Sequence, residues 1–231
     1  MQTGSGKVSE LILQDGRRAA RISCPADLIP HPGQYLLASD DSYAALPVSL
    51  YYTESASDGV AVAPWRHFIA SPAPETWAPG MEIFLRGPLG RGFKLPASAR
   101  KIALVAFDDS PARLRGLIAP ALKQGAAVTL LSDSPVDNLP DDVEVQPLAA
   151  LADMAEWAEY AAFDVTRENL PRLVEKLNGL SQPSRWKEAE VFIHAPVICG
   201  GVAECGVCAV VTKSGWKMAC KDGPVFDLRE I

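Results

Sequence analysis

Apolar and polar residues alternate in short stretches along the first hundred positions, separated by Pro, Gly and Ser. Such alternation is typical of strands with one buried face. Two of these stretches, KVSELILQDG and RRAARISCPA, flank Asp15-Gly16, which is a hairpin signal. Further stretches follow at short spacing with no helical period among them, including GQYLLAS, LPVSLYYTE, GVAVAPWRHFIAS and MEIFLRG. The pattern predicts a small antiparallel β-barrel.

The pattern changes after residue 97. KIALVAF (101–107) is a nearly continuous apolar run, ARLRGLIAPALKQG has a helical period that ends at Gly125, and AAVTLLSD is a second buried-type strand. A strand, a helix and a strand in this order indicate a parallel unit. Two more helical stretches, LAALADMAEWAEYA and TRENLPRLVEKLNGL, precede a last strand, EVFIHAP. The second half therefore predicts an α/β layer around a parallel sheet.

These patterns divide the chain into three parts. We predict an antiparallel β-barrel over 1–97, a nucleotide-binding-like parallel α/β domain over 98–196 and a cysteine-bearing segment over 197–231. The fold class is thus a two-domain chain that combines α+β and α/β elements. With 231 residues, of which 48% are hydrophobic, the chain can bury a core without disulfide bonds.

Charge and hydropathy exclude two classes of partner. The net charge is -6, with acidic and basic residues interspersed, so no basic stripe for nucleic acid is present. No run approaches the roughly 18 apolar residues that a membrane span needs, and the first residues contain no apolar signal core. We therefore expect a cytoplasmic protein without a membrane span.

The chemistry is concentrated in four cysteines near the end of the chain, Cys199, Cys205, Cys208 and Cys220. In a reducing compartment, clustered cysteines are more often metal ligands or redox groups than disulfides. Small residues between them let the backbone fold around a metal centre. AVVTKSGWKMA is typical of a hairpin that turns at Ser214-Gly215 and returns the fourth cysteine to the others. The fifth, Cys24, is expected to be a buried small hydrophobe.

The cysteine spacing is x5, x2 and x11, and three interpretations stay open. Plant-type [2Fe-2S] ferredoxins use C-x4-C-x2-C with a distant fourth cysteine, one residue shorter in the first gap. Four thiolates also form closed zinc sites, but zinc ribbons usually pair two C-x2-C knuckles and this segment has one. The third interpretation is two unrelated pairs of buried thiols. The asymmetric, glycine-containing loop favours the iron–sulfur cluster.

Several segments resemble one known family. CGGVAECGVCAV followed by CKDGPVF resembles the C-terminal segment of the iron–sulfur electron-transfer subunits of dihydroorotate dehydrogenase, which belong to the ferredoxin reductase superfamily. HPGQYLLAS, LPVSLYY and LRGPLGRGF resemble, in order, that family's barrel strand, its flavin-contacting strand and the segment that joins the barrel to the nucleotide domain. The resemblance covers nearly the whole chain and implies the same order of domains.

The resemblance implies an electron relay. In the family, electrons pass between a nicotinamide nucleotide, FAD, a [2Fe-2S] cluster and FMN in a separate catalytic subunit. Carried over to this chain, the four clustered cysteines hold the cluster, and Pro47, Val48 and Ser49 contact a flavin. The resemblance also implies a hetero-oligomer with a redox partner protein. That partner is a dihydroorotate dehydrogenase catalytic subunit, which would place the chain in pyrimidine biosynthesis, or another flavoprotein.

The family's phosphate-binding elements are altered in this chain. Leu46 stands where family members carry an arginine that neutralises the FAD pyrophosphate, and GVAVAPWRHFIAS lacks their Gly-x-Gly-Thr strand end. Arg66, in that stretch, is interpreted as a solvated charge rather than a replacement. The glycine-rich turn of the nucleotide domain is replaced by AFDDSPARL, where Asp109 or Ser110 is expected to cap the helix. FAD therefore stays open as a cofactor of weak affinity, and NAD(P) is not expected.

These observations predict a non-catalytic electron-transfer subunit of an oxidoreductase complex. It would carry one [2Fe-2S] cluster, relay electrons to or from its partner and no longer use NAD(P)H directly. Two alternatives stay open. One is an intact FAD-dependent NAD(P)H reductase subunit, and the other is a zinc-stabilised structural or assembly subunit.

Overall fold

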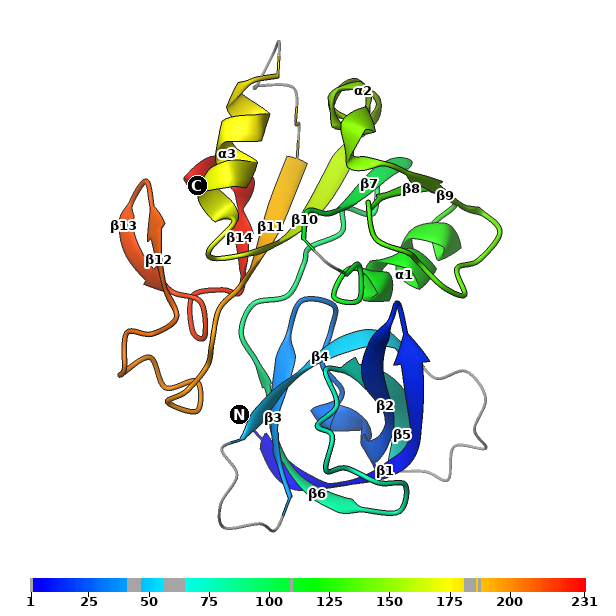
Figure 1. Ribbon diagram of the computed structural model, residues 1–231, viewed down its shortest axis with the longest axis vertical. Helices are drawn as coiled ribbons and strands as arrows, with labels where there is room; N and C mark the ends of the chain where they lie inside the picture. Colours follow the sequence, from blue (N-terminus) through cyan, green and yellow to red (C-terminus); the bar gives the residue numbers. More distant parts are fainter. Residues whose placement is uncertain (1, 41–46, 56–64, 109, 181–185, 187) are drawn as a thin grey trace.

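A computed structural model describes residues 2–40, 47–55, 65–108, 110–180, 186 and 188–231. Figure 1 shows a barrel below, an α/β layer above it and a C-terminal hairpin beside that layer. None of the helices in these described ranges is both long and apolar enough to cross a membrane.

The N-terminal half forms the predicted closed antiparallel barrel, in the strand order β1-β2-β5-β4-β3-β6. Its strands are β1 (Gln2–Gln14), β2 (Arg17–Pro25), β3 (Tyr35–Ser39), β4 (Val48–Ser55), β5 (Trp65–Ser71) and β6 (Glu82–Leu89), with a 3₁₀ turn, η1 (Ala26–Leu28). Asp15 and Gly16 both have positive φ, 49° and 71°, which suits the tight turn between β1 and β2. The predicted hairpin is confirmed.

The second half is built on a six-stranded sheet of order β14-β11-β10-β7-β8-β9. Five strands are parallel, and β14 runs antiparallel to β11 at one edge. The strands are β7 (Lys101–Ala106), β8 (Ala127–Leu131), β9 (Val143–Gln146), β10 (Tyr160–Thr166), β11 (Glu188–His194) and β14 (Val225–Asp227). The helical segments are η2 (Arg115–Leu117), α1 (Ile118–Lys123), η3 (Leu148–Ala150), α2 (Leu151–Trp157), α3 (Leu170–Asn178) and η5 (Leu228–Glu230).

Three strands of this sheet, β9, β10 and β14, were not predicted. The helical period of LAALADMAEWAEYA ends at Trp157, and β10 begins at Tyr160 within the stretch assigned to the helix. This strand is buried on almost every residue, and a short, continuously apolar run cannot be told from a buried helix by its period. The edge strand β9 was also missed. The helix expected to end at Gly125 is short, because its first turn is the 3₁₀ segment η2.

The cysteine segment packs into the α/β layer. Strands β12 (Ala209–Thr212) and β13 (Gly215–Met218) form the predicted hairpin. Because Thr212 pairs with Gly215, the turn lies at Lys213-Ser214, one residue before the expected position. The chain then adds β14 to the edge of the main sheet. The boundaries at 97 and 196 fall between β6 and β7 and just after β11, and they stay predictions.

A buried ion pair joins the barrel to the α/β layer. Arg115 is 4% exposed, and its guanidinium donates to both carboxylate oxygens of Asp15 at 2.9 and 3.2 Å. The same group donates to the carbonyls of Asp137 and Asn138. Burial raises the pKa of the Asp15 carboxyl, and its hydrogen bonds and Arg115 oppose that rise. The pair therefore holds the β1–β2 turn against the second domain.

We expect Arg115→Met to destabilise the protein by about 3–5 kcal/mol, because the substitution leaves the Asp15 carboxylate buried without its partner. Urea unfolding measures this change. Arg21→Met is the control, because Arg21 forms a partly exposed pair with Glu10 at 2.9 Å and its loss should cost at most about 1 kcal/mol. Equal losses in the two variants would contradict a special role for the buried pair.

Candidate metal centre

The first three clustered cysteines lie on the loop that follows β11, beside the barrel (Figure 1). Four residues of this loop have positive φ, between 63° and 77°, namely Gly200, Gly201, Ala203 and Gly206. Glycine adopts this region without steric cost, and Ala203 is the exception that the loop imposes. This backbone conformation curls the loop, so that the N–H groups of Glu204 and Cys205 point at the Cys199 thiol.

Two glycines also let the loop approach the barrel closely. A Cβ on Gly200 would lie 3.0 Å from the Arg86 guanidinium, and one on Gly201 would lie 2.8 Å from the Tyr35 hydroxyl. These distances leave no room for a larger residue unless the barrel side chains move. The small residues predicted to allow folding around a metal centre therefore also seat the loop on the barrel.

The four cysteines are arranged as two pairs. The Cys205 side chain and backbone N–H groups of the loop act on the Cys199 thiol. The Cys208 side chain and the N–H of Ala203 act on the Cys220 thiol. No group of three or more His, Cys, Asp or Glu side chains in the described ranges has the spacing to hold a metal ion.

The two pairs differ in exposure, and Cys199 and Cys220 differ in acidity. Cys205 is exposed, whereas Cys208 and Cys220 are 1% and 2% exposed. The backbone N–H groups of Glu204 and then Cys205 lower the pKa of Cys199 to about 6, and burial raises the pKa of Cys220 to about 12. The outer pair, Cys199 and Cys205, thus reaches the surface, while the inner pair, Cys208 and Cys220, is buried.

This donor set fits a two-iron cluster. A [2Fe-2S] cluster takes four cysteine thiolates, two on each iron, and hydrogen bonds to its sulfurs tune its potential. The outer pair, the inner pair and the N–H groups directed at Cys199 supply these features. Cys24 is separate from them: it is fully buried in the barrel core, as expected, and burial raises its pKa to about 12.

The three residues expected to contact a flavin have different surroundings. Pro47 is exposed and lines a cavity of about 490 Å³ between β1, β3, β6 and Gly200 of the cysteine loop. Val48 packs against the barrel core, and the Ser49 side chain lies near the Tyr51 hydroxyl. Only Pro47 of the three lines this cavity, and the flavin contacts stay a prediction.

Arg86 is the residue of this cavity that the sequence analysis missed. It lines the cavity beside Gly200, and its Nε is buried with no hydrogen-bond partner in the described chain. It lies in LRGPLGRGF, the stretch compared with the family's joining segment, but nothing in that stretch marks it as a ligand.

Two of the positions compared with the family's FAD phosphate-binding elements, Leu46 and residues 59–64, lie outside the described residues. Arg66 is exposed on β5, as expected for a solvated charge.

The carboxyl ends of β7, β10 and β11 form the edge where nucleotides bind in sheets of this kind. Here the Asp108 carboxylate occupies the turn after β7, and it accepts hydrogen bonds from the Thr166 N–H and from the Asn169 amide. Asp109 lies outside the described residues. Ser110 accepts from the N–H of Ala112 at 3.2 Å, so it caps the turn before η2 rather than the first turn of α1. A negative charge thus stands where an anion would bind.

Packed side chains join this edge to the barrel. Arg113 donates from its Nε to both oxygens of Asp164, at 3.0 and 2.9 Å, and its guanidinium lies over the rings of Tyr51 and Phe192. Tyr51 also meets Phe192 and His194 edge-on, at 5.3 and 5.7 Å between ring centroids. Burial lowers the pKa of His194 to about 4, so its imidazole is neutral at pH 7. These side chains therefore fill the space between the carboxyl edge of the sheet and strand β4 of the barrel.

The barrel followed by the parallel sheet defines a ferredoxin-reductase fold with a cysteine segment added at its end, which confirms the predicted fold class. Residues 197–231 match the family model of the iron-sulfur cluster binding domain of dihydroorotate dehydrogenase B. The predicted resemblance is confirmed for this segment.

Similar solved structures support the fold along almost the whole chain. The NADH-dependent reduced ferredoxin-NADP oxidoreductase, described for flavin-based electron bifurcation, is 16% identical, with a TM-score of 0.72 over 97% of this chain and 88% of that one. The ferredoxin reductase in carbazole 1,9a-dioxygenase is 15% identical, with a TM-score of 0.59 over 84% and 69%. The flavohem-like FAD/NAD binding domain of nitric oxide dioxygenase from Vibrio cholerae O1 biovar El Tor is 16% identical, with a TM-score of 0.55 over 82% and 98%. At these identities the likeness shows the fold alone.

We expect Cys208→Ser to remove most of the iron and acid-labile sulfide from anaerobically purified protein. Removing a residue that only hydrogen-bonds to a metal ligand lowers metal affinity by about 10–100-fold. Removing Cys208, which would bind iron directly, should therefore lower it further. Cys24→Ser is the matched control, since Cys24 is equally buried but lies in the barrel core. Full iron and sulfide content in the Cys208 variant would refute its assignment as a ligand.

Proposed function

We propose that this chain is an electron-transfer subunit that carries one [2Fe-2S] cluster and relays electrons to or from a partner oxidoreductase. The observation that carries the proposal is the pairing of the four cysteines in a loop whose N–H groups surround Cys199. The match of residues 197–231 to an iron–sulfur domain supports it. When bound, the cluster would store one electron at a time.

We further propose that the chain does not use NAD(P)H directly. A dinucleotide needs backbone N–H groups and open space at the carboxyl edge of the sheet. In this chain the Asp108 carboxylate stands in the first turn, and the Arg113 guanidinium, whose Nε donates to both oxygens of Asp164, lies over the ring of Tyr51. A pyrophosphate bound there would face the Asp108 carboxylate, whose nearby donors, the Thr166 N–H and the Asn169 amide, are already taken, and this supports the loss of this activity.

The cavity beside the cysteine loop favours a second candidate, an FAD-dependent reductase subunit. Its volume of about 490 Å³ lies in the range of small-molecule sites, about 300–1,000 Å³. Leu37 and Phe84 supply apolar walls, and Arg86 supplies a positive charge. Arg86 could replace the arginine that is absent at position 46. This candidate differs from the first in requiring bound flavin.

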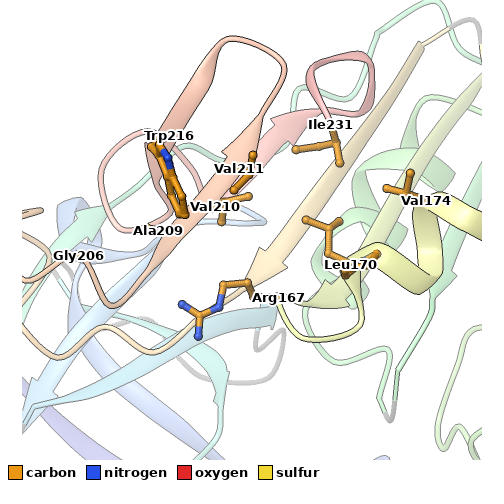
Figure 2. A pocket seen from close by; sticks show the side chains of 10 residues that line it. Arg167, Leu170, Val174, Gly206, Ala209, Val210, Val211, Trp216 and Ile231 are labelled. Carbon is orange, nitrogen blue, oxygen red and sulfur yellow. The ribbon is translucent and has the colours of Figure 1, made fainter.

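The partner is proposed to dock on the outer face of the β12–β13 hairpin. Val211 and Trp216 are cross-strand neighbours, 61% and 71% exposed. They border a groove of about 540 Å³ that Arg167 and Ile231 also line (Figure 2). Arg167 donates to the carbonyl of Val207, which directly precedes the ligand Cys208. Exposed Trp and Arg are typical anchors of protein interfaces, and this surface adjoins the cluster.

A redox partner suits this surface because electron transfer requires the cluster to lie close to the partner's own redox centre. We propose the FMN-containing catalytic subunit of a dihydroorotate dehydrogenase B, so that the assembly is a hetero-oligomer active in pyrimidine biosynthesis in the cytoplasm. The family match of the cysteine segment supports this choice, and another flavoprotein is the alternative.

Metal, sulfide and flavin content test the proposed function. We expect about two iron and two acid-labile sulfide per anaerobically purified chain, no flavin, and the electron paramagnetic resonance signal of a reduced two-iron cluster after dithionite. NADH should not reduce the protein. Stoichiometric FAD together with reduction by NADH would establish the second candidate instead. Zinc without sulfide would refute both and leave a structural subunit.

Trp216→Ser should weaken binding to the purified dihydroorotate dehydrogenase B catalytic subunit by about tenfold or more, because buried Trp residues are common interface hot spots. Isothermal titration calorimetry measures the dissociation constant. Leu13→Ser is the matched control, since Leu13 is also 71% exposed but lies on β1 of the barrel. If the unaltered chain does not bind, this partner is wrong even where the cluster is present.

A further inference from the structure

Tyr35 connects the barrel to both parts of the cysteine segment. It is the first residue of β3 and is fully buried. Its hydroxyl donates a hydrogen bond of 2.9 Å to the backbone carbonyl of Cys220, 185 residues later in the chain. The same hydroxyl lies 2.8 Å from the position that a Cβ would take on Gly201. One side chain therefore contacts the loop of the outer pair and the backbone of the inner pair.

The ring of Tyr35 is held in an apolar environment. It packs with Leu37, Tyr51, Phe192 and Val225, and its centroid lies 6.0 Å from that of Tyr51. A Cβ on Gly90 would lie 3.1 Å from the ring, so the backbone of that glycine also packs closely against it. A hydroxyl fixed in such a medium exerts a stronger electrostatic effect than one in water, because few dipoles can reorient to screen it.

We propose that Tyr35 is a positioning residue that sets the reduction potential of the iron–sulfur cluster. This inference rests on the proposed function. The Tyr35 hydroxyl draws electron density from the Cys220 peptide and keeps the positive end of its dipole beside a ligand residue. Reduction adds one negative charge to the cluster, and a positive dipole end fixed near the cluster in a low-dielectric medium favours that added charge. Loss of the hydroxyl therefore makes the potential more negative.

The variant Tyr35→Phe keeps the ring and removes the hydroxyl. In a redox titration of the anaerobically purified full chain, followed by electron paramagnetic resonance, we expect unchanged iron and sulfide and a more negative midpoint. The ratio of reduced to oxidised cluster at the wild-type midpoint should fall by about threefold or more. At 59 mV per tenfold for one electron, this change corresponds to about 28 mV.

Tyr160→Phe is the matched control. Tyr160 is 1% exposed, and its hydroxyl donates to Glu190 at 2.7 Å, between β10 and β11 of the sheet. This variant removes another buried phenol hydrogen bond, so it should lower thermal stability but leave the cluster midpoint unchanged. A structural role of Tyr35 alone would make the two variants behave alike.

The possible outcomes separate the two proposals. A wild-type midpoint in Tyr35→Phe, or an equal shift in Tyr160→Phe, would overturn the role of Tyr35 while the proposed function stands. Complete loss of the cluster in Tyr35→Phe alone would also overturn it, since Tyr35 would then serve assembly rather than potential. Wild-type protein without acid-labile sulfide would overturn both proposals.

Discussion

The seating of the cysteine segment against the barrel is the constraint on which the site depends. The loop after β11 brings Cys199 and Cys205 together through four residues at positive φ, and at Ala203, which is not glycine, this conformation costs free energy that other contacts must offset. Tyr35 and the close approach of Gly201 provide such contacts, and β14 completes them by pairing with β11. The cysteine segment is thus held by both domains.

The same packing that holds this segment also fills the space between the barrel and the carboxyl edge of the sheet. Tyr51 lies beside Tyr35 and also beneath the guanidinium of Arg113, which is itself paired with Asp164. A buried charge pair of this kind is costly to separate, so the region has little tendency to open for a ligand. The protein thus combines a segment that matches an iron–sulfur domain with a sheet edge filled by its own side chains, and this combination supports the proposed relay.

Most of the fold could be predicted because its signals are local. Alternation of polar and apolar residues marked the barrel strands, and Asp15-Gly16 marked their first turn. β10 was missed because a strand buried on both faces loses that alternation, and its apolar run continues the helical pattern before Trp157. The ion pair of Arg115 with Asp15 has no sequence signal, because a hundred residues separate the partners.

The sequence by itself determined the kind of chemistry, because cysteine side chains and their spacing suffice to indicate a metal centre, and small residues around them indicate a tight loop. Only the tertiary structure decided which thiols pair and which lie at the surface. It also decided that Pro47 faces the cavity while Val48 packs on the barrel core, and that Arg86 and Tyr35 adjoin the cysteine loop. These relations depend on contacts between distant segments, which form only when the barrel and the sheet bury their apolar surfaces against each other.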